Sequence, residues 1–358
     1  MLRPQLLKVA KYVPGKSQTE VDRESVLLRA YGNKTEILID RDRDARLHAL
    51  CAKHRLAPPL LARFKNGLMY RYIIGQVCTP QDIINERVWR AVAKHLGEWH
   101  ARLPIDSVAG VIHLPGSRSA NSAKSQSAES CFDISCRSPV PNIWSVMQRW
   151  IDALPCGSPG QKSQKEMLQI ELDRSFRDLD NQRGPGSRGF VLGHCDLVSA
   201  NIVMLPKDTV NSTADEDIRV SFIDYEYATP CPAAFDIANH FAEWGGYDCD
   251  HKMLPTKSIR RRFLKDYLQS YKAHCDTPIC DEILDVLFEE VDRYRGMPGF
   301  YGGLWALIQA SISQIDFDYA SLAEVRLGEY FAWRAEENGS RAKEGKSMPL
   351  RERRWAET

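Results

Sequence analysis

The first part of the chain alternates short apolar runs with polar turns. Five of these runs have the spacing of strands: Leu6 to Tyr12, Val26 to Tyr31, Glu36 to Ile39, Leu60 to Phe64 and Leu68 to Ile74. We predict turns at Pro14-Gly15 and at Asn66-Gly67, because Asn-Gly favours a tight hairpin. Residues Asp40 to His54 carry helical spacing. The pattern therefore predicts a small sheet with one helix.

Longer helical patterns dominate the rest of the chain. Apolar positions repeat at helical spacing in four stretches: Asn85 to Leu103, Ile143 to Leu154, Glu166 to Gln182 and Ala233 to about Glu336. Three short apolar runs lie between them and predict strands: Phe190 to Gly193, Asn201 to Leu205 and Arg219 to Ile223.

These patterns predict an α+β fold of two lobes. The small N-terminal β-sheet lobe is expected over residues 1–75, and a larger, mainly helical C-terminal lobe over residues 76–336. A Ser-rich insertion at about 104–141 is predicted to be disordered because it has low complexity. Residues 337–358 are predicted to form a polar tail.

Composition narrows the partners of this chain. It has 358 residues, 43% of them hydrophobic, and 48 basic residues against 47 acidic ones give a net charge of +1. A balanced chain lacks the overall positive field of a nucleic-acid-binding protein. Ten cysteines are scattered without a Cys-x-x-Cys pair, which favours reduced thiols in a cytoplasmic protein over a zinc site. No apolar stretch is long enough for stable membrane insertion.

One loop carries the spacing of a phosphotransferase. The stretch from His194 to Asn201 reads HCDLVSAN, which is H-x-D-x-x-x-x-N, the catalytic-loop layout of the protein-kinase-like fold. Asp196 would orient or accept the proton of the acceptor hydroxyl. Asn201, five residues on, would turn back onto a metal ion beside the phosphates of ATP. The pattern predicts transfer of a phosphoryl group to an alcohol.

A second acidic position follows the next apolar run. Asp224 directly follows the apolar run that ends at Ile223, and an aromatic residue comes next. The same order occurs in the Asp-Phe-Gly metal ligand of kinases, here with Glu226 in place of Gly. A hairpin from Asn201 to Asp224 would gather Asp196, Asn201 and Asp224 at one site. Their oxygens suit Mg²⁺, with Asn201 and Asp224 as its ligands.

Several further segments resemble the choline/ethanolamine kinases. They include FDIANHFAEW from Phe235 to Trp244 and WALIQA from Trp305 to Ala310, and the segment from Arg29 to Arg41 resembles the ethanolamine branch. The resemblance runs from about Leu6 to Tyr330. It implies phosphorylation of ethanolamine by ATP, the first step of phosphatidylethanolamine synthesis from free ethanolamine. It is also compatible with a homodimer.

The resemblance also assigns residues to the two substrates. On the ATP side, Arg29 would contact the phosphates, Asp44 would steady that cation, and a hinge would bind adenine through Arg71, Tyr72 and Ile73. On the amine side, the resemblance assigns Glu226, Glu243, Trp244, Tyr247 and Trp305. A carboxylate accepts hydrogen bonds from a primary ammonium, and aromatic faces attract a quaternary one. Asp236 would hold the catalytic loop.

Two departures from the family pattern leave alternatives open. The family's glycine-containing nucleotide loop has no counterpart before Leu6, so we expect either weakened ATP binding or a sequence that lacks its true start. Gly302 stands where the family usually has a second Trp, which favours ethanolamine over choline because a cation–π face is lost. Choline kinase, another small-alcohol phosphotransferase and a weakly active pseudokinase remain the alternatives.

Overall fold

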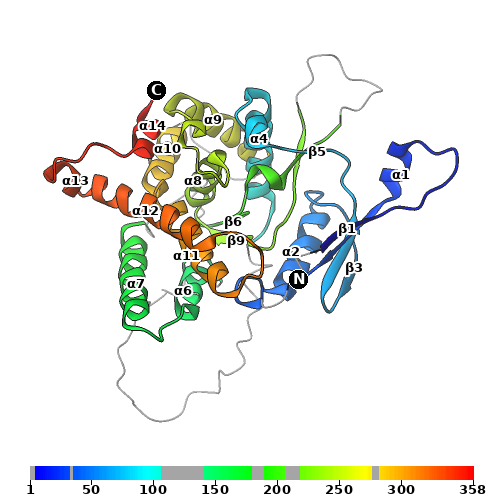
Figure 1. Ribbon diagram of the computed structural model, residues 1–358. Coiled ribbons are helices and arrows are strands. Elements are labelled where there is room, and N and C mark those ends of the chain that lie inside the picture. The colour runs from blue at the N-terminus through cyan, green and yellow to red at the C-terminus, as the bar shows by residue number, and fades with distance from the viewer. Residues whose placement is uncertain (1–4, 33–34, 106–140, 180–188, 207–217, 276–281) are drawn as a thin grey trace, which may run out of the picture.

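A computed structural model describes residues 5–32, 35–105, 141–179, 189–206, 218–275 and 282–358 (Figure 1). The N-terminal region is a four-stranded antiparallel sheet of order β1-β2-β4-β3, with bounds Gln5–Val9, Val26–Ala30, Gly67–Arg71 and Leu60–Phe64. The sheet contains the predicted hairpin of β3 and β4. Helix α2, Arg41–Lys53, begins at its N-cap Asp40, whose side chain accepts from the amides of Asp42 and Arg43.

The predicted turn at Pro14-Gly15 is present between β1 and β2, but a helix that we did not predict follows it. Helix α1, Gln18–Glu24, starts at Ser17, whose side chain and that of Glu20 cap each other's backbone amides in a capping box. This Ser-x-x-Glu spacing is a local signal that could have been found in the sequence. The strand predicted at Glu36 to Ile39 was also wrong, because Thr35–Ile37 forms a 3₁₀ turn, η1, leading into α2.

Short strands join the sheet to the helical region. Strands β5, Gln76–Val77, β7, Ile202–Met204, and β8, Val220–Phe222, form one antiparallel sheet. The predicted hairpin of β7 and β8 is therefore present, with Ile202 opposite Phe222. Strand β6, Val191–Gly193, pairs with β9, Thr229–Cys231, a strand that the sequence analysis missed.

Helices form the rest of the molecule and pack around one core (Figure 1). Their bounds are Pro80–Ile83 (α3), Glu86–Arg102 (α4), Ile143–Ala153 (α6), Pro159–Leu179 (α7), Ala233–Ala242 (α8), Lys257–Ala273 (α9), Ile283–Tyr294 (α10), Met297–Ile312 (α11), Tyr319–Glu337 (α12), Ser340–Lys343 (α13) and Leu350–Ala356 (α14). In α4 the predicted apolar stripe is buried, with Trp89, Val92, Leu96 and Trp99 in the core. The fold class is as predicted.

The C-terminal segment belongs to the core, contrary to the predicted polar tail. Trp355 in α14 is only 4% exposed, and its Nε1 donates to Oδ1 of Asp292 in α10 at 2.8 Å. Arg260 in α9 lies over the Trp355 ring. The apolar Trp355 thus anchors a charged segment. The predicted Ser-rich insertion lies almost wholly outside the described residues. In the part of the chain that the structure describes, no helix has the length and apolar character needed to cross a bilayer.

Candidate active site

Helix α8 packs against the loop from His194 to Asn201 and forms hydrogen bonds with its backbone. Its Asp236 is buried and accepts from the backbone amides of His194 at 3.0 Å and Cys195 at 2.7 Å. His100 of α4 donates from Nε2 to Asp236 at 2.9 Å. Although burial alone would raise the pKa of Asp236, these hydrogen bonds lower it, so the carboxylate stays charged. Asp236 therefore anchors the loop, as the resemblance implied.

The same helix also fixes the carbonyl groups of the loop. Asn239 donates from Nδ2 to the Cys195 carbonyl at 3.2 Å, and His240 donates from Nδ1 to the Leu197 carbonyl at 2.8 Å. Cys195 has a φ of 60°, the left-handed conformation that favours Gly or Asn. These contacts hold the backbone on both sides of Asp196. The loop is thus held in place by hydrogen bonds from α8.

Asp196 and Asn201 are directly linked across this loop. Nδ2 of Asn201 donates to the Asp196 carbonyl at 2.8 Å and to Oδ2 of its side chain at 3.0 Å. With its nitrogen bound there, the amide oxygen of Asn201 is the atom that can bind a metal ion. Burial raises the pKa of Asp196 well above its usual range, and the nearby carboxylates of Asp224 and Glu243 add to the effect.

Strand pairing brings Asp224 to the same place. The amide of Ile223 donates to the Asn201 carbonyl at 3.0 Å, so the two strands meet just before Asp224. Asp224 itself has a φ of 65°, which turns its side chain out of the strand direction. Its Oδ1 is buried and makes no hydrogen bond to the described residues, although Arg29 Nη1 lies 2.7 Å away. Such an oxygen suits Mg²⁺, which the family implies.

Arg29, on the inner strand β2 of the small sheet, lies between two carboxylates. It forms ion pairs with Asp224 and with Glu226, one through each terminal nitrogen. The structure thus places Glu226 beside Arg29, and Glu226 is not among the residues that line the cavity beside Asp196, contrary to its assignment to the amine. Because Glu226 and Asp224 converge on one cation, Glu226 is a further candidate ligand for Mg²⁺. Asp44 accepts from the Tyr31 hydroxyl at 2.9 Å, and its charge helps raise the pKa of Arg29 against the opposing effect of burial.

Of the three residues predicted to form the hinge, Arg71 ends β4, and Tyr72 and Ile73 follow it before β5. The amide of Arg71 donates to the Pro59 carbonyl and that of Tyr72 to the Ser25 carbonyl, both at 3.1 Å. Both amides are therefore used in hydrogen bonds within the small-sheet region. Ile73 follows them and is half-buried.

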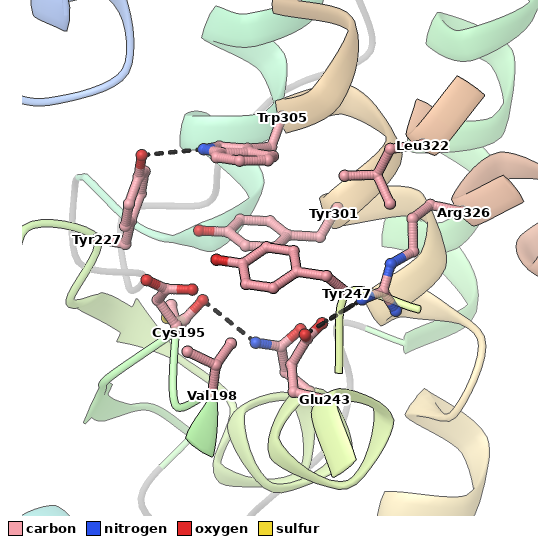
Figure 2. A pocket seen from close by; sticks show the side chains of 12 residues that line it. Cys195, Val198, Tyr227, Glu243, Tyr247, Tyr301, Trp305, Leu322 and Arg326 are labelled. Atoms are coloured by element: carbon pink, nitrogen blue, oxygen red, sulfur yellow. Dashed lines mark hydrogen bonds and ion pairs between the residues drawn. The ribbon is translucent and has the colours of Figure 1, made fainter. Parts of the chain in front are cut away.

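A small cavity opens beside Asp196 (Figure 2). Its volume is about 90 Å³, comparable with a few water molecules. It is lined by one carboxylate opposite Asp196 and by four aromatic rings, namely Glu243, Tyr227, Tyr247, Tyr301 and Trp305. Trp305 donates from Nε1 to the Tyr227 hydroxyl at 2.9 Å, which fixes both rings.

Trp244 does not line this cavity. It is 1% exposed, and its Nε1 donates to Nε2 of His240 at 3.2 Å inside the core. The residue follows Glu243 directly, and consecutive residues of a helical turn face different directions. The sequence therefore assigned the wrong neighbour to the amine.

Sequence reasoning also missed several residues that line the cavity. The sequence analysis assigned no role to Tyr227, Tyr301 or Arg326, all of which line the cavity. Tyr227 stands three residues after Asp224, a spacing that could have suggested it. Nothing local to the sequence marks Arg326, because its role comes from a contact with Glu243, 83 residues away.

Together, the fold and the loop define a class of protein. A small sheet lobe, a helical lobe, and an Asp-containing loop beside a second Asp at a hairpin end are the features of a protein-kinase-like phosphotransferase. Solved structures agree on the fold. An ethanolamine kinase of Plasmodium vivax matches with a TM-score of 0.64 and 23% identity, covering 90% of this chain and 82% of that one. A choline kinase of Cryptosporidium parvum matches with a TM-score of 0.60 and 17% identity, covering 94% and 91%.

Sequence comparison narrows the class to one family. The profile of the choline/ethanolamine kinases matches residues 5–331, and the chain belongs to that family. It is 31% identical to human ethanolamine kinase 1 over 323 residues, which is 87% of this chain and 62% of the relative. It is 30% identical to the ethanolamine kinase of Drosophila melanogaster, over 87% of this chain and 54% of the relative. The chain thus spans only part of these relatives.

Proposed function

We propose that this chain transfers the γ-phosphoryl group of ATP to the hydroxyl of ethanolamine and releases phosphoethanolamine. One observation carries the proposal: Asp196 and Glu243 line the same small cavity. A short amino alcohol has a hydroxyl for one carboxylate and an ammonium for the other. The relatives named ethanolamine kinase support this substrate.

The proposed roles follow from the geometry. Asp196 orients the acceptor hydroxyl and takes its proton as the new oxygen–phosphorus bond forms. Asn201, Asp224 and Glu226 offer oxygens to Mg²⁺, which when bound neutralises charge on the phosphates. Arg29 contacts the phosphates, and the hinge at Arg71 to Ile73 contacts adenine.

The proposal places the enzyme at the first step of phosphatidylethanolamine synthesis from free ethanolamine. The described cysteines are free thiols, which suits the reducing cytoplasm that the sequence analysis predicted.

Choline is the second candidate acceptor, because four aromatic rings line the cavity. Their faces would attract a trimethylammonium group by about 0.5–2 kcal/mol each. Glu243 favours ethanolamine, since a primary ammonium can donate hydrogen bonds to it and a trimethylammonium cannot.

Phosphorus NMR of the purified chain with Mg²⁺ and ATP tests the proposal. Separate reactions contain ethanolamine, choline or no acceptor. We expect a phosphoethanolamine signal with ethanolamine, a smaller product signal with choline, and a loss of about 10²–10⁴-fold in rate for Asp196→Asn. A faster reaction with choline would make the chain a choline kinase. ATP left intact with every acceptor would support the pseudokinase alternative.

A further inference from the structure

Arg326 of α12 lines the cavity beside Asp196, and its side chain points toward Glu243 (Figure 2). Its Nη2 lies 3.0 and 3.1 Å from the two oxygens of Glu243. The side chain of Arg326 is 7% exposed and that of Glu243 is 17% exposed, so water screens this pair weakly. The carboxylate that would receive the substrate's ammonium therefore already has a fixed partner.

Gly302, which has no side chain, lies beside Arg326. A Cβ atom placed on Gly302 of α11 would lie 3.7 Å from Cγ, 3.8 Å from Cδ and 3.9 Å from Nε of Arg326. Any larger group at position 302 would extend into the space that the arginine fills. The arginine thus occupies one wall of the cavity and limits its volume.

A second carboxylate offsets the charge of Arg326. Glu329, one turn further along α12, lies 3.7 Å from Nη1 of Arg326, and its side chain is 8% exposed. Its other oxygen contacts Nε2 of His251 at 2.7 Å. Burial disfavours the charged guanidinium, yet Glu243 and Glu329 raise the pKa of Arg326 overall. Arg326 is thus shared between two carboxylates, so it offsets the negative charge of Glu243 only in part.

Resting on the proposed function, we propose that Arg326 is a specificity-determining residue that favours primary ammonium groups over N-methylated ones. A primary ammonium is small and donates hydrogen bonds, so it can share the Glu243 oxygens with the arginine. Each N-methyl group removes one donor and adds volume on the side where Arg326 stands. The preference for ethanolamine over its N-methylated analogues therefore rises with the number of methyl groups. Part of this preference comes from steric exclusion of the methyl groups by Arg326.

The test compares four acceptors with increasing methylation: ethanolamine, its N-methyl and N,N-dimethyl derivatives, and choline. For Arg326→Met we expect the ratio of kcat/KM for ethanolamine to that for choline to fall by about tenfold, because methyl groups gain space and the donor competition ends. Arg326→Lys keeps a cation on α12 and should give an intermediate ratio. It also protects the test if the Met variant folds poorly.

Arg334→Met is the matched control. Arg334 lies two turns further along the same helix, is 10% exposed and pairs with Glu171 and Asp178, away from the cavity. We expect it to lower stability and leave the ratio unchanged. A shift of the ratio in Arg334→Met, or an unchanged ratio in both Arg326 variants of an active enzyme, would overturn the role of Arg326. A wild-type chain inactive on all four acceptors would refute the proposed function, and this inference with it.

Glu329→Gln separates charge from shape. The variant removes the compensating carboxylate and leaves the arginine wall in place. We expect the KM of ethanolamine and of choline to rise by a common factor of about tenfold, with their ratio unchanged. A changed ratio would mean that charge, and not the volume taken by Arg326, determines the preference.

Discussion

Two arginines flank Asp196, and each lies between two carboxylates. On the ATP side, Arg29 from the small sheet pairs with Asp224 and Glu226. On the amine side, Arg326 from α12 pairs with Glu243 and Glu329. The charges of the two groups are the same, so any difference in what they do must come from their surroundings.

The surroundings differ in exposure and in support. The Asp224 side chain is 37% exposed, although its Oδ1 is buried, and it stands on a loop at the end of a strand, whereas the Glu329 side chain is 8% exposed on a helix packed against α11. The other two carboxylates differ little, with Glu226 12% and Glu243 17% exposed. A partly exposed pair costs little to separate, and a buried pair costs several kcal/mol. On the ATP side, the pair that we expect to exchange partners with a ligand is therefore Arg29 with Asp224. The amine-side group is fixed and gives the cavity its shape.

The largest effect is expected from Asp224→Asn. Loss of this carboxylate removes a proposed Mg²⁺ ligand and leaves Arg29 with one partner, so we expect kcat to fall by about 10³-fold, or 4 kcal/mol. The measurement is a steady-state assay over a range of Mg²⁺ concentrations. Asp42→Asn is the control, because the Asp42 side chain is 65% exposed and pairs only with Arg63 in the described residues. A kcat close to wild type would remove Asp224 from the metal site.

Arg29→Met should act on ATP alone. We expect the KM for MgATP to rise about thirtyfold, the equivalent of 2 kcal/mol for one charge-assisted contact, while the KM for ethanolamine stays within about twofold. Arg63→Met, on β3 of the same sheet, serves as the matched control. A rise in the KM for ethanolamine would show that the two sides are not separate.

Acid should lower the folding stability of the protein through His240 of α8. Burial lowers the pKa of His240 to about 4, although the hydrogen bond from its Nδ1 to the Leu197 carbonyl opposes this shift. Protonation of Nε2 would also break the hydrogen bond that it accepts from Trp244. A lowered pKa means that this stability is complete above the unfolded value near 6.5 and is lost as the pH falls towards 4. Near pH 5.5 the loss is about 1.4 kcal/mol.

Urea unfolding at pH 7.5 and pH 5.5 measures this loss. Glutamine does not titrate. Between pH 7.5 and pH 5.5 the free energy of unfolding of His240→Gln should therefore fall by about 1.4 kcal/mol less than that of the wild type. Equal losses in the two proteins would show that His240 is not buried as a neutral ring.

The smallest effect is expected from Cys195→Gly. Glycine relieves the left-handed conformation, worth about 1–2 kcal/mol, but loses the buried thiol that lies 3.8 Å from the sulfur of Cys231. The two changes nearly cancel, so stability should change by less than about 1 kcal/mol and kcat/KM by less than twofold. Thermal unfolding provides the measurement. Destabilisation beyond about 3 kcal/mol would mean that the loop needs the thiol itself.

The sequence predicted those features whose causes are local. The link between Asp196 and Asn201 depends on a five-residue loop, and the hairpin that brings Asp224 close depends on two apolar runs, so spacing was sufficient. Contacts between distant elements could not be predicted in this way. Arg326 and Trp355 look polar or terminal in the sequence, and only the packing of α12 on α11 and of α14 on α10 gives them their roles.

Trp244 and Glu226 show a second limit. Each is the sequence neighbour of a residue that lines the cavity, Glu243 and Tyr227 respectively. Resemblance to a family cannot tell which of two neighbouring side chains faces the cavity. The direction of each side chain depends on the helical turn at Glu243 and on the loop after Asp224. The capping box at Ser17, by contrast, was present in the sequence and overlooked.

A crystal structure of the chain with Mg²⁺, a non-hydrolysable ATP analogue and ethanolamine tests the central claim most directly. We predict that Arg29 leaves Asp224 for the phosphates, while Arg326 keeps its contacts of 3.0 and 3.1 Å with Glu243. An Arg29 that remains on Asp224, or an Arg326 that swings away from Glu243 when the amine binds, would contradict the account.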